Sequence, residues 1–244
     1  DCEVNDLELL LADLATLERR EEKVRSMAKA QPREFESELD LLARMRAHLE
    51  GERLALQFSA SQKEADMLSP LNLLTAKPRL YIANVGEDSL PGNGPLADLV
   101  LERARQEDAQ AAVICAQLEA DLADWTAEEA AEYRAELGLE ASGLEQLVRA
   151  GFRLLNLITF FTATGTSVVR AWTLREGQSA LDAAGSVHTD MQRGFIRAEV
   201  LPYTDLMACG SFQTARDRGL LRLEGRDYVV QDGDIVHIRF SPPR

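Results

Sequence analysis

The stretch LYIANV, residues 80–85, decides how the middle of the chain folds. It is a short apolar run without helical period that closely follows Pro78, and such a run is typical of a buried strand. Residues 96–107 have the pattern of a helix, and residues 111–115 form a second apolar run. Strand, helix and strand within about 35 residues predict a βαβ unit with two parallel strands. Two parallel strands are too few for a stable sheet, so we expect that a further part of an α/β domain lies upstream of Asp1 or is absent.

An antiparallel helical hairpin is predicted before this unit, over residues 1–69. Apolar side chains recur every three or four positions between residues 7 and 29, and again from Pro32 to about Phe58. Pro32 suits the first turn of the second helix. Basic side chains gather near the connection of the two helices: Arg19, Arg20, Lys23, Arg25, Lys29 and Arg33. They form either a basic tip that faces a partner or simply a solvated end of the hairpin.

From about residue 157 onward, the sequence pattern is typical of β-strands. Apolar alternation and turn residues predict strands at 157–163, 168–174, 195–200, 220–223 and 235–240, with helical pieces at 179–184 and 203–218. A small mixed sheet packed on one helix, as in ubiquitin-like β-grasp domains, is the simplest interpretation. The predicted organisation is therefore α/β plus α+β in three parts: 1–69, 70–151 and 152–244.

Composition excludes several classes of protein. Of the 244 residues, 45% are apolar and 28% charged, which is ordinary for a globular protein and excludes a fibrous or wholly disordered chain. The net charge of −14 is unevenly spread: residues 70–151 hold 6 basic and 15 acidic side chains, whereas residues 152–244 hold 11 and 10. The acidity therefore belongs mainly to the middle part, and a sum over the whole chain hides the local excess of basic side chains between Arg19 and Arg33.

Cysteines and apolar runs indicate a cytoplasmic protein that does not enter a membrane. The chain has 3 cysteines without CxxC spacing, which indicates neither a disulfide framework nor a zinc site. The longest mostly apolar run, 154–163, is about half the length of a membrane span. No secretory signal opens the chain, and its start at Asp1 suggests an upstream segment.

A candidate ligand site follows the first parallel strand, because open α/β sheets bind ligands at the carboxyl ends of their strands. Asn84 and Glu87 lie at this position, and the second strand ends at Cys115, next to Ala116. An Asn amide offers a donor and an acceptor to a purine. The alternative is an ordinary structural turn. The sequence contains no HExxH or GxSxG motif. It also contains no GxxxxGK[ST] loop, so the part of a nucleotide site that binds the phosphates is missing from these 244 residues.

The three histidines are scattered and define no catalytic group. We expect His48 on the solvated side of the second hairpin helix and His237 in a structural position on a strand. His188 begins the string HTDMQRGFIRAEV, residues 188–200, and either packs in the predicted β-grasp domain or contacts a partner.

Several stretches together resemble the YchF/Obg-like ATPase family of translation-factor P-loop proteins. They are LLLADLATLE (9–18), LLTAKP (73–78) before YIANV (81–85), LITFFT (157–162), RAWT (170–173), HTDMQRGFIRAEV (188–200) and DYVVQDGD (227–234). The resemblance implies a coiled-coil hairpin inserted into a P-loop NTPase sheet, here partial, and a C-terminal TGS domain. It covers nearly the whole chain.

The resemblance also implies a function. Members hydrolyse ATP in preference to GTP because Asn-x-x-Glu, here Asn84 and Glu87, replaces the Asn-Lys-x-Asp of ordinary GTPases, with Val85 packing on the base. The implied ligand is ATP, held by Asn84, Val85, Glu87, Cys115 and Ala116, with Mg²⁺ and K⁺; the implied partner is the ribosome. The family's phosphate loop, magnesium ligands and catalytic histidine have no counterpart here, so no catalytic or metal-binding residue is assigned, and this chain alone is not expected to hydrolyse ATP.

Two hypotheses follow. In the first, the chain is the larger part of an ATP-dependent, ribosome-associated switch. In the second, residues 1–69 and 152–244 form a non-catalytic clamp for RNA or the ribosome, without DNA sequence specificity. Trp172 or Phe195 would then stack on bases, although a core position is the alternative for Trp172. The expected nucleic-acid contacts are Arg19, Arg20, Lys23, Arg25, Arg193 and Arg197, with Arg170, Arg216, Arg218 and Arg222 on the same phosphate-facing side.

Overall fold

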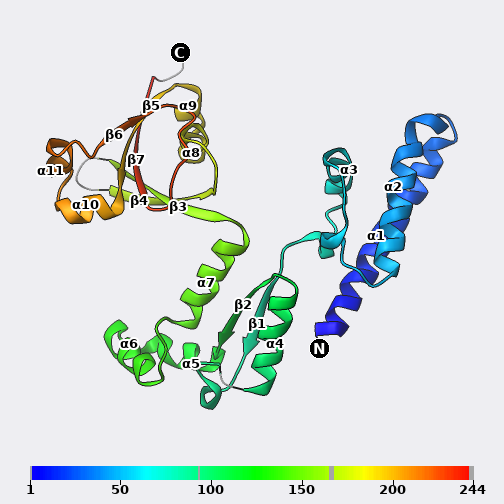
Figure 1. Cartoon of the computed structure of the whole chain (residues 1–244), viewed down its shortest axis with the longest axis horizontal. Coiled ribbons are helices and arrows are strands. Elements are labelled where there is room, and N and C mark those ends of the chain that lie inside the picture. Colours follow the sequence, from blue (N-terminus) through cyan, green and yellow to red (C-terminus); the bar gives the residue numbers. More distant parts are fainter. Residues whose placement is uncertain (1, 93, 165–167, 242–244) are drawn as a thin grey trace. The chain divides into compact units, whose positions relative to one another are not determined.

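A computed structural model describes residues 2–92, 94–164 and 168–241. The chain divides into two compact units, Asp1–Arg79 and Leu80–Arg244. The fold is mixed α/β, with one parallel two-stranded sheet and one mixed five-stranded sheet (Figure 1). No helix among the described residues is both long and apolar enough to cross a membrane.

The first unit is built on two long helices. Helices α1 (Cys2–Ala28) and α2 (Pro32–Glu50) are joined by residues 29–31 and pack along one another (Figure 1). Their apolar stripes meet in a core that contains Leu17, Val24 and Met45. The prediction of a second helix to Phe58 was wrong. α2 ends at Glu50 because Gly51 is a poor helix former and Glu52 adopts a positive φ of 56°.

Residues 55–76 cover this helix pair with short elements. These are η1 (Ala55–Gln57), α3 (Gln62–Leu68), η2 (Ser69–Leu71) and η3 (Leu74–Ala76). The prediction that His48 is solvated was also wrong: its side chain is buried, with Nε2 2.9 Å from the carbonyl oxygen of Leu54 and its ring edge-on to Phe58. The chain returns over the polar side of α2 after Gly51, which the helical pattern alone did not indicate.

The second unit begins with the predicted βαβ arrangement. Strands β1 (Leu80–Asn84) and β2 (Gln110–Ile114) are parallel, and α4 (Pro95–Gln106) connects them. η4 (Glu87–Ser89) precedes α4. After β2 come α5 (Ala116–Asp121), η5 (Leu122–Asp124), α6 (Ala127–Glu136) and α7 (Gly143–Leu154).

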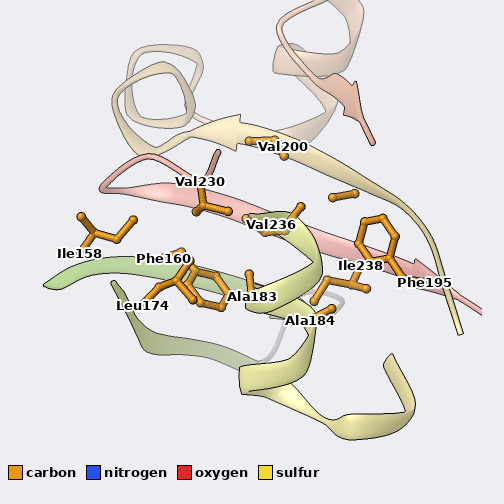
Figure 2. Packing of buried hydrophobic residues seen from close by; sticks show 12 residues of the cluster. Ile158, Phe160, Leu174, Ala183, Ala184, Phe195, Val200, Val230, Val236 and Ile238 are labelled. Carbon is orange, nitrogen blue, oxygen red and sulfur yellow. The ribbon is translucent and has the colours of Figure 1, made fainter. Parts of the chain in front are cut away.

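The five-stranded sheet has the order β4-β3-β7-β5-β6. Its strands are β3 (Leu157–Thr164), β4 (Val168–Arg175), β5 (Phe195–Pro202), β6 (Arg222–Glu224) and β7 (Asp234–Phe240). β3 and β7 are parallel and the other neighbours antiparallel. Helix α8 (Ala180–Val187) packs on one face through Ala183 and Ala184, against Phe160, Val200 and Val236 (Figure 2).

Three further helices belong to this sheet. α9 (Thr189–Arg193) follows α8, and α10 (Tyr203–Cys209) and α11 (Phe212–Asp217) follow β5. The single helical piece predicted at 203–218 is thus two helices. Gly210 adopts a φ of +74° after α10, and Ser211 then starts a new helix by accepting the backbone N–H of Thr214.

Candidate functional site

The carboxyl ends of β1 and β2 lie side by side, as the βαβ prediction required. The N–H of Val85 donates to the carbonyl of Ile114 at 2.9 Å, so pairing continues past β1. One residue earlier, the Oδ1 atom of Asn84 accepts the N–H of Ala116 at 3.0 Å. Asn84 and Ala116 are both exposed. The hydrogen bond fixes the orientation of an amide that still has its Nδ2 donor and an oxygen lone pair to offer.

Glu87 lies in η4 and is bound to a residue that the sequence analysis did not identify. Its Oε1 accepts the phenol O–H of Tyr133, in α6, at 2.6 Å. This hydrogen bond is the first cause of a pKa of Tyr133 above its ordinary value, because the carboxylate disfavours the phenolate. Glu87 is therefore oriented by α6. Tyr133 lies 46 residues away along the chain, and no local pattern connects the two.

Cys115 is part of a small core. Its side chain is buried with Leu118, Leu122 and Ala130, so it supports the turn after β2 from beneath. Beside it, Glu119 accepts the N–H of Gly143 at 2.7 Å and pairs with Arg134 at 3.2 Å. The turn after β2 is thus held in place by the packing of Cys115 and by the carboxylate of Glu119.

The basic residues of the hairpin are partly paired with acidic ones. Arg20 donates from Nε to Glu38 at 2.7 Å, and Arg25 pairs with Glu21 on its own helix. Arg19 donates to the carbonyl of Ala15 at 3.2 Å, while Lys23 is exposed. The positive charge here is therefore smaller than the count of basic residues suggests.

The candidates in the sheet differ in their surroundings. Arg193 and Arg197 are exposed. Phe195 is 9% exposed within the core, so the prediction that it stacks on a base was wrong. Trp172 packs partly buried against the same core and donates from Nε1 to Thr162 at 2.8 Å, which confirms the core alternative for this residue. His188 accepts the N–H of Asp190 through Nδ1 at 3.1 Å and so caps α9.

A metal site made of protein side chains alone would need several carboxylate or imidazole ligands, whereas Mg²⁺ at a nucleotide is usually held by one or two carboxylates together with the phosphates. Among residues 2–92, 94–164 and 168–241 no three His, Cys, Asp or Glu side chains gather around one point. The described residues therefore do not fit a magnesium site of their own, and no step of chemistry is assigned to one.

The family model and the sequence relatives that match this chain carry the same family name, YchF. The family model YchF-GTPase_C, described as a protein of unknown function, matches residues 157–241. The chain is 41% identical over 243 residues to a protein named ribosome-binding ATPase YchF from Bacillus subtilis, and 44% identical over 243 residues to one of the same name from Escherichia coli O157:H7. Each alignment covers 99% of this chain, which spans 66% of the relative.

Solved structures agree with the sequence relatives. The structure of the Schizosaccharomyces pombe YchF GTPase matches with a TM-score of 0.84 at 28% identity, over 98% of this chain and 65% of that one. A GTP binding protein from Pyrococcus horikoshii matches in fold alone, with a TM-score of 0.59 at 19% identity, over 99% of this chain and 71% of that one. By sequence and by fold, this chain belongs to the YchF/Obg-like family.

Proposed function

We propose that this chain is the base-recognising and ribosome-binding portion of a cytoplasmic, nucleotide-dependent switch that binds and hydrolyses ATP, and GTP less well, when joined to a phosphate-binding part. The observation that carries the proposal is the exposed Asn84 amide, held by Ala116 where two parallel strands end. The names of the relatives, ribosome-binding ATPase, support it. Mg²⁺ and K⁺ would be bound with the phosphates.

The proposed organisation follows the family. Residues 1–69 would be a coiled-coil insertion, residues 70–151 part of the nucleotide-binding α/β domain, and residues 152–244 a TGS domain of the β-grasp type. The packing of α8 on one face of a five-stranded mixed sheet supports the last assignment.

The fixed amide of Asn84 supports a preference for adenine. Adenine offers an amino donor at N6 and an acceptor at N7, and an Asn amide can bind both. Guanine offers an oxygen in place of the amino group. Because Oδ1 of Asn84 is oriented by the N–H of Ala116, that guanine oxygen would meet another oxygen and gain no hydrogen bond. Val85 would pack on the base, Cys115 and Ala116 would form the turn beside it, and Glu87 would line the site from η4.

Titration calorimetry on the protein with its phosphate-binding part tests this site. Asn84→Ala should weaken ATP binding about tenfold, the equivalent of one lost hydrogen bond of roughly 1.4 kcal/mol, and GTP binding less. Asn5→Ala, at an exposed position of α1, is the control. Unchanged ATP affinity in Asn84→Ala contradicts the base site.

Co-sedimentation of the chain with purified ribosomes tests the second part of the proposal. Binding should weaken steeply with salt, since it would depend on Lys and Arg near phosphates. Replacing Lys23 and Arg193 with Ala should reduce the salt dependence, as should replacing Arg19, Arg20, Arg25 and Arg197. Binding that does not change with salt contradicts the proposed contacts.

A non-catalytic clamp for RNA or the ribosome is the second candidate function. It is favoured by the exposure of Arg193 and Arg197 in a part of the chain whose core cluster draws only on residues from Ile158 onward. Ribosome binding that is equal with and without ATP would support the clamp over the switch.

A further inference from the structure

The five-stranded sheet has a second face, opposite the one that packs on α8. Side chains alternate along a strand, and Ala198 and Val200 of β5 and Val236 and Ile238 of β7 all point into the α8 core. The residues between them therefore belong to the other face. Figure 1 shows α10 and α11 on the side of the strands away from α8.

This second face contains a cavity of about 380 Å³, within the range of small-molecule sites. β5 supplies Glu199, β7 supplies Ile235, His237 and Arg239, and α11 supplies Phe212 and Arg216. Glu199 and His237 are direct partners across the two strands, and Arg197 is the partner of Arg239. The lining of the cavity thus combines apolar side chains with charged ones from β5, β7 and α11.

The charged groups leave one cation uncompensated. Glu199 is only 8% exposed, and its Oε1 accepts from Nη2 of Arg239 at 2.5 Å, so these two charges balance. Arg216 is exposed, and within the described part of the chain it forms no ion pair. A ligand with one negative group near Arg216 would therefore balance the positive charge of this side chain.

An aromatic ring lies beside this cation. Phe212 is 44% exposed at the first position of α11 and lines the cavity. An exposed ring next to a guanidinium is the combination with which proteins bind unpaired nucleotides: the base stacks on the ring, and the cation binds the phosphate.

We propose that this cavity binds one nucleotide of single-stranded RNA, with the base against Phe212, its phosphate at Arg216 and the neighbouring phosphate at Arg197. The inference rests on the RNA or ribosome partner proposed above and specifies where that partner is bound. Glu199 adds selectivity, because its carboxylate accepts from the amino group of adenine or cytosine, which uracil lacks.

Fluorescence anisotropy with labelled single-stranded RNA of eight adenines, cytosines or uracils tests the proposal on the full chain. Phe212→Ala should weaken binding of the adenine and cytosine RNAs about tenfold, as expected for one lost stacking contact. Arg216→Ala should weaken binding and reduce the slope of log K against log salt by about 0.7. Glu199→Gln should reduce the difference in affinity between adenine RNA and uracil RNA.

Two control variants, Leu144→Ala and Arg226→Ala, change exposed residues outside the cavity. Both should bind each RNA with the affinity of the unaltered chain. Circular dichroism checks that each variant is folded.

The outcomes separate the possible failures. Equal RNA affinity in Phe212→Ala and the unaltered chain overturns the inference, and ribosome co-sedimentation that persists in that variant shows that the proposed function survives without it. Displacement of the RNA by AMP at a comparable concentration would show a site for free nucleotides and overturn the assignment to RNA. If the chain binds RNA through Phe212 but does not sediment with ribosomes, the cavity is an RNA site and the proposal of ribosome binding is wrong.

Discussion

Asp13 lies in the middle of α1 and is 1% exposed, yet it carries a carboxylate. Its oxygens accept three hydrogen bonds from η3: the N–H of Leu74 at 2.7 Å, the N–H of Thr75 at 2.8 Å and the hydroxyl of Thr75 at 2.7 Å. The same hydroxyl accepts the N–H of Ala55 at 3.0 Å. One acidic side chain therefore ties residues 74–75 to the first helix, and Thr75 extends the link to η1.

Replacing Asp13 with Ala should destabilise the first unit by roughly 2–4 kcal/mol, because buried N–H donors would lose their acceptor. Urea unfolding followed by circular dichroism measures the change. Glu18→Ala, at an exposed position of the same helix, is the control and should alter stability by less than about 0.5 kcal/mol. Equal stability of the two variants would contradict this role of Asp13.

Tyr228 has a pKa raised to about 12, first because burial disfavours its phenolate and second because its O–H donates to Asp234 at 2.7 Å. A phenol with a raised pKa in the folded state stabilises the fold fully below its ordinary pKa of 10.0 and loses this contribution as pH rises towards 12. The difference between phenolate absorbance titrations of the unaltered chain and Tyr228→Phe should show this pKa. Asp234→Asn should lower it while leaving it above 10.0, since burial remains. A midpoint at the ordinary value in the unaltered chain contradicts the burial of this group.

At the scale of elements, Gly194 separates α9 from β5 where the backbone of Ser241 passes close by. A methyl group on Gly194 would overlap the carbonyl oxygen of Ser241, whose own N–H donates to Gly194 at 2.9 Å. The need for glycine here comes from this close approach, since φ is −93°. The glycine in the string 188–200 therefore has a structural role.

Gly194→Ala and Gly151→Ala should change stability in opposite directions. The first forces backbone apart and should destabilise the second unit by about 1–3 kcal/mol. The second lies inside α7 with no atom near the added methyl group, so it should stabilise by about 0.5–1 kcal/mol through helix propensity. Urea unfolding followed by tryptophan fluorescence measures both. Destabilisation by Gly151→Ala would show that α7 cannot accept a side chain there.

Sequence patterns predicted elements well where one physical signal was strong. The strands of both sheets were predicted within a few residues, because apolar runs alternate with glycine and aspartate turns. Helix α7 was not predicted, although Ser142 and Glu145 form a capping box that marks its start. Candidate site positions at strand ends could be predicted from topology. The bond of Glu87 to Tyr133, the burial of His48 and the cavity beside Phe212 could not, since each depends on residues brought together only by the fold.

At the scale of the whole molecule, the two units have separate cores. The core of the first includes Leu17 and Met45, and the larger core of the second includes Phe160 and Val236. Both tryptophans of the chain, Trp125 and Trp172, belong to the second unit. Tryptophan fluorescence therefore reports on the second unit alone, whereas circular dichroism at helix wavelengths reports on both.

We expect two unfolding transitions in urea, because separate cores unfold as separate cooperative units. Asp13→Ala should shift the dichroism transition of the first unit to lower urea while the fluorescence transition stays in place. Gly194→Ala should shift the fluorescence transition of the second unit to lower urea, while the dichroism transition of the first unit stays in place. Each variant is thus the control for the other, with the same chain and the same titration. A single transition that both variants shift equally, in both signals, would show that the units unfold together, and the stability of the hairpin would then depend on the sheet.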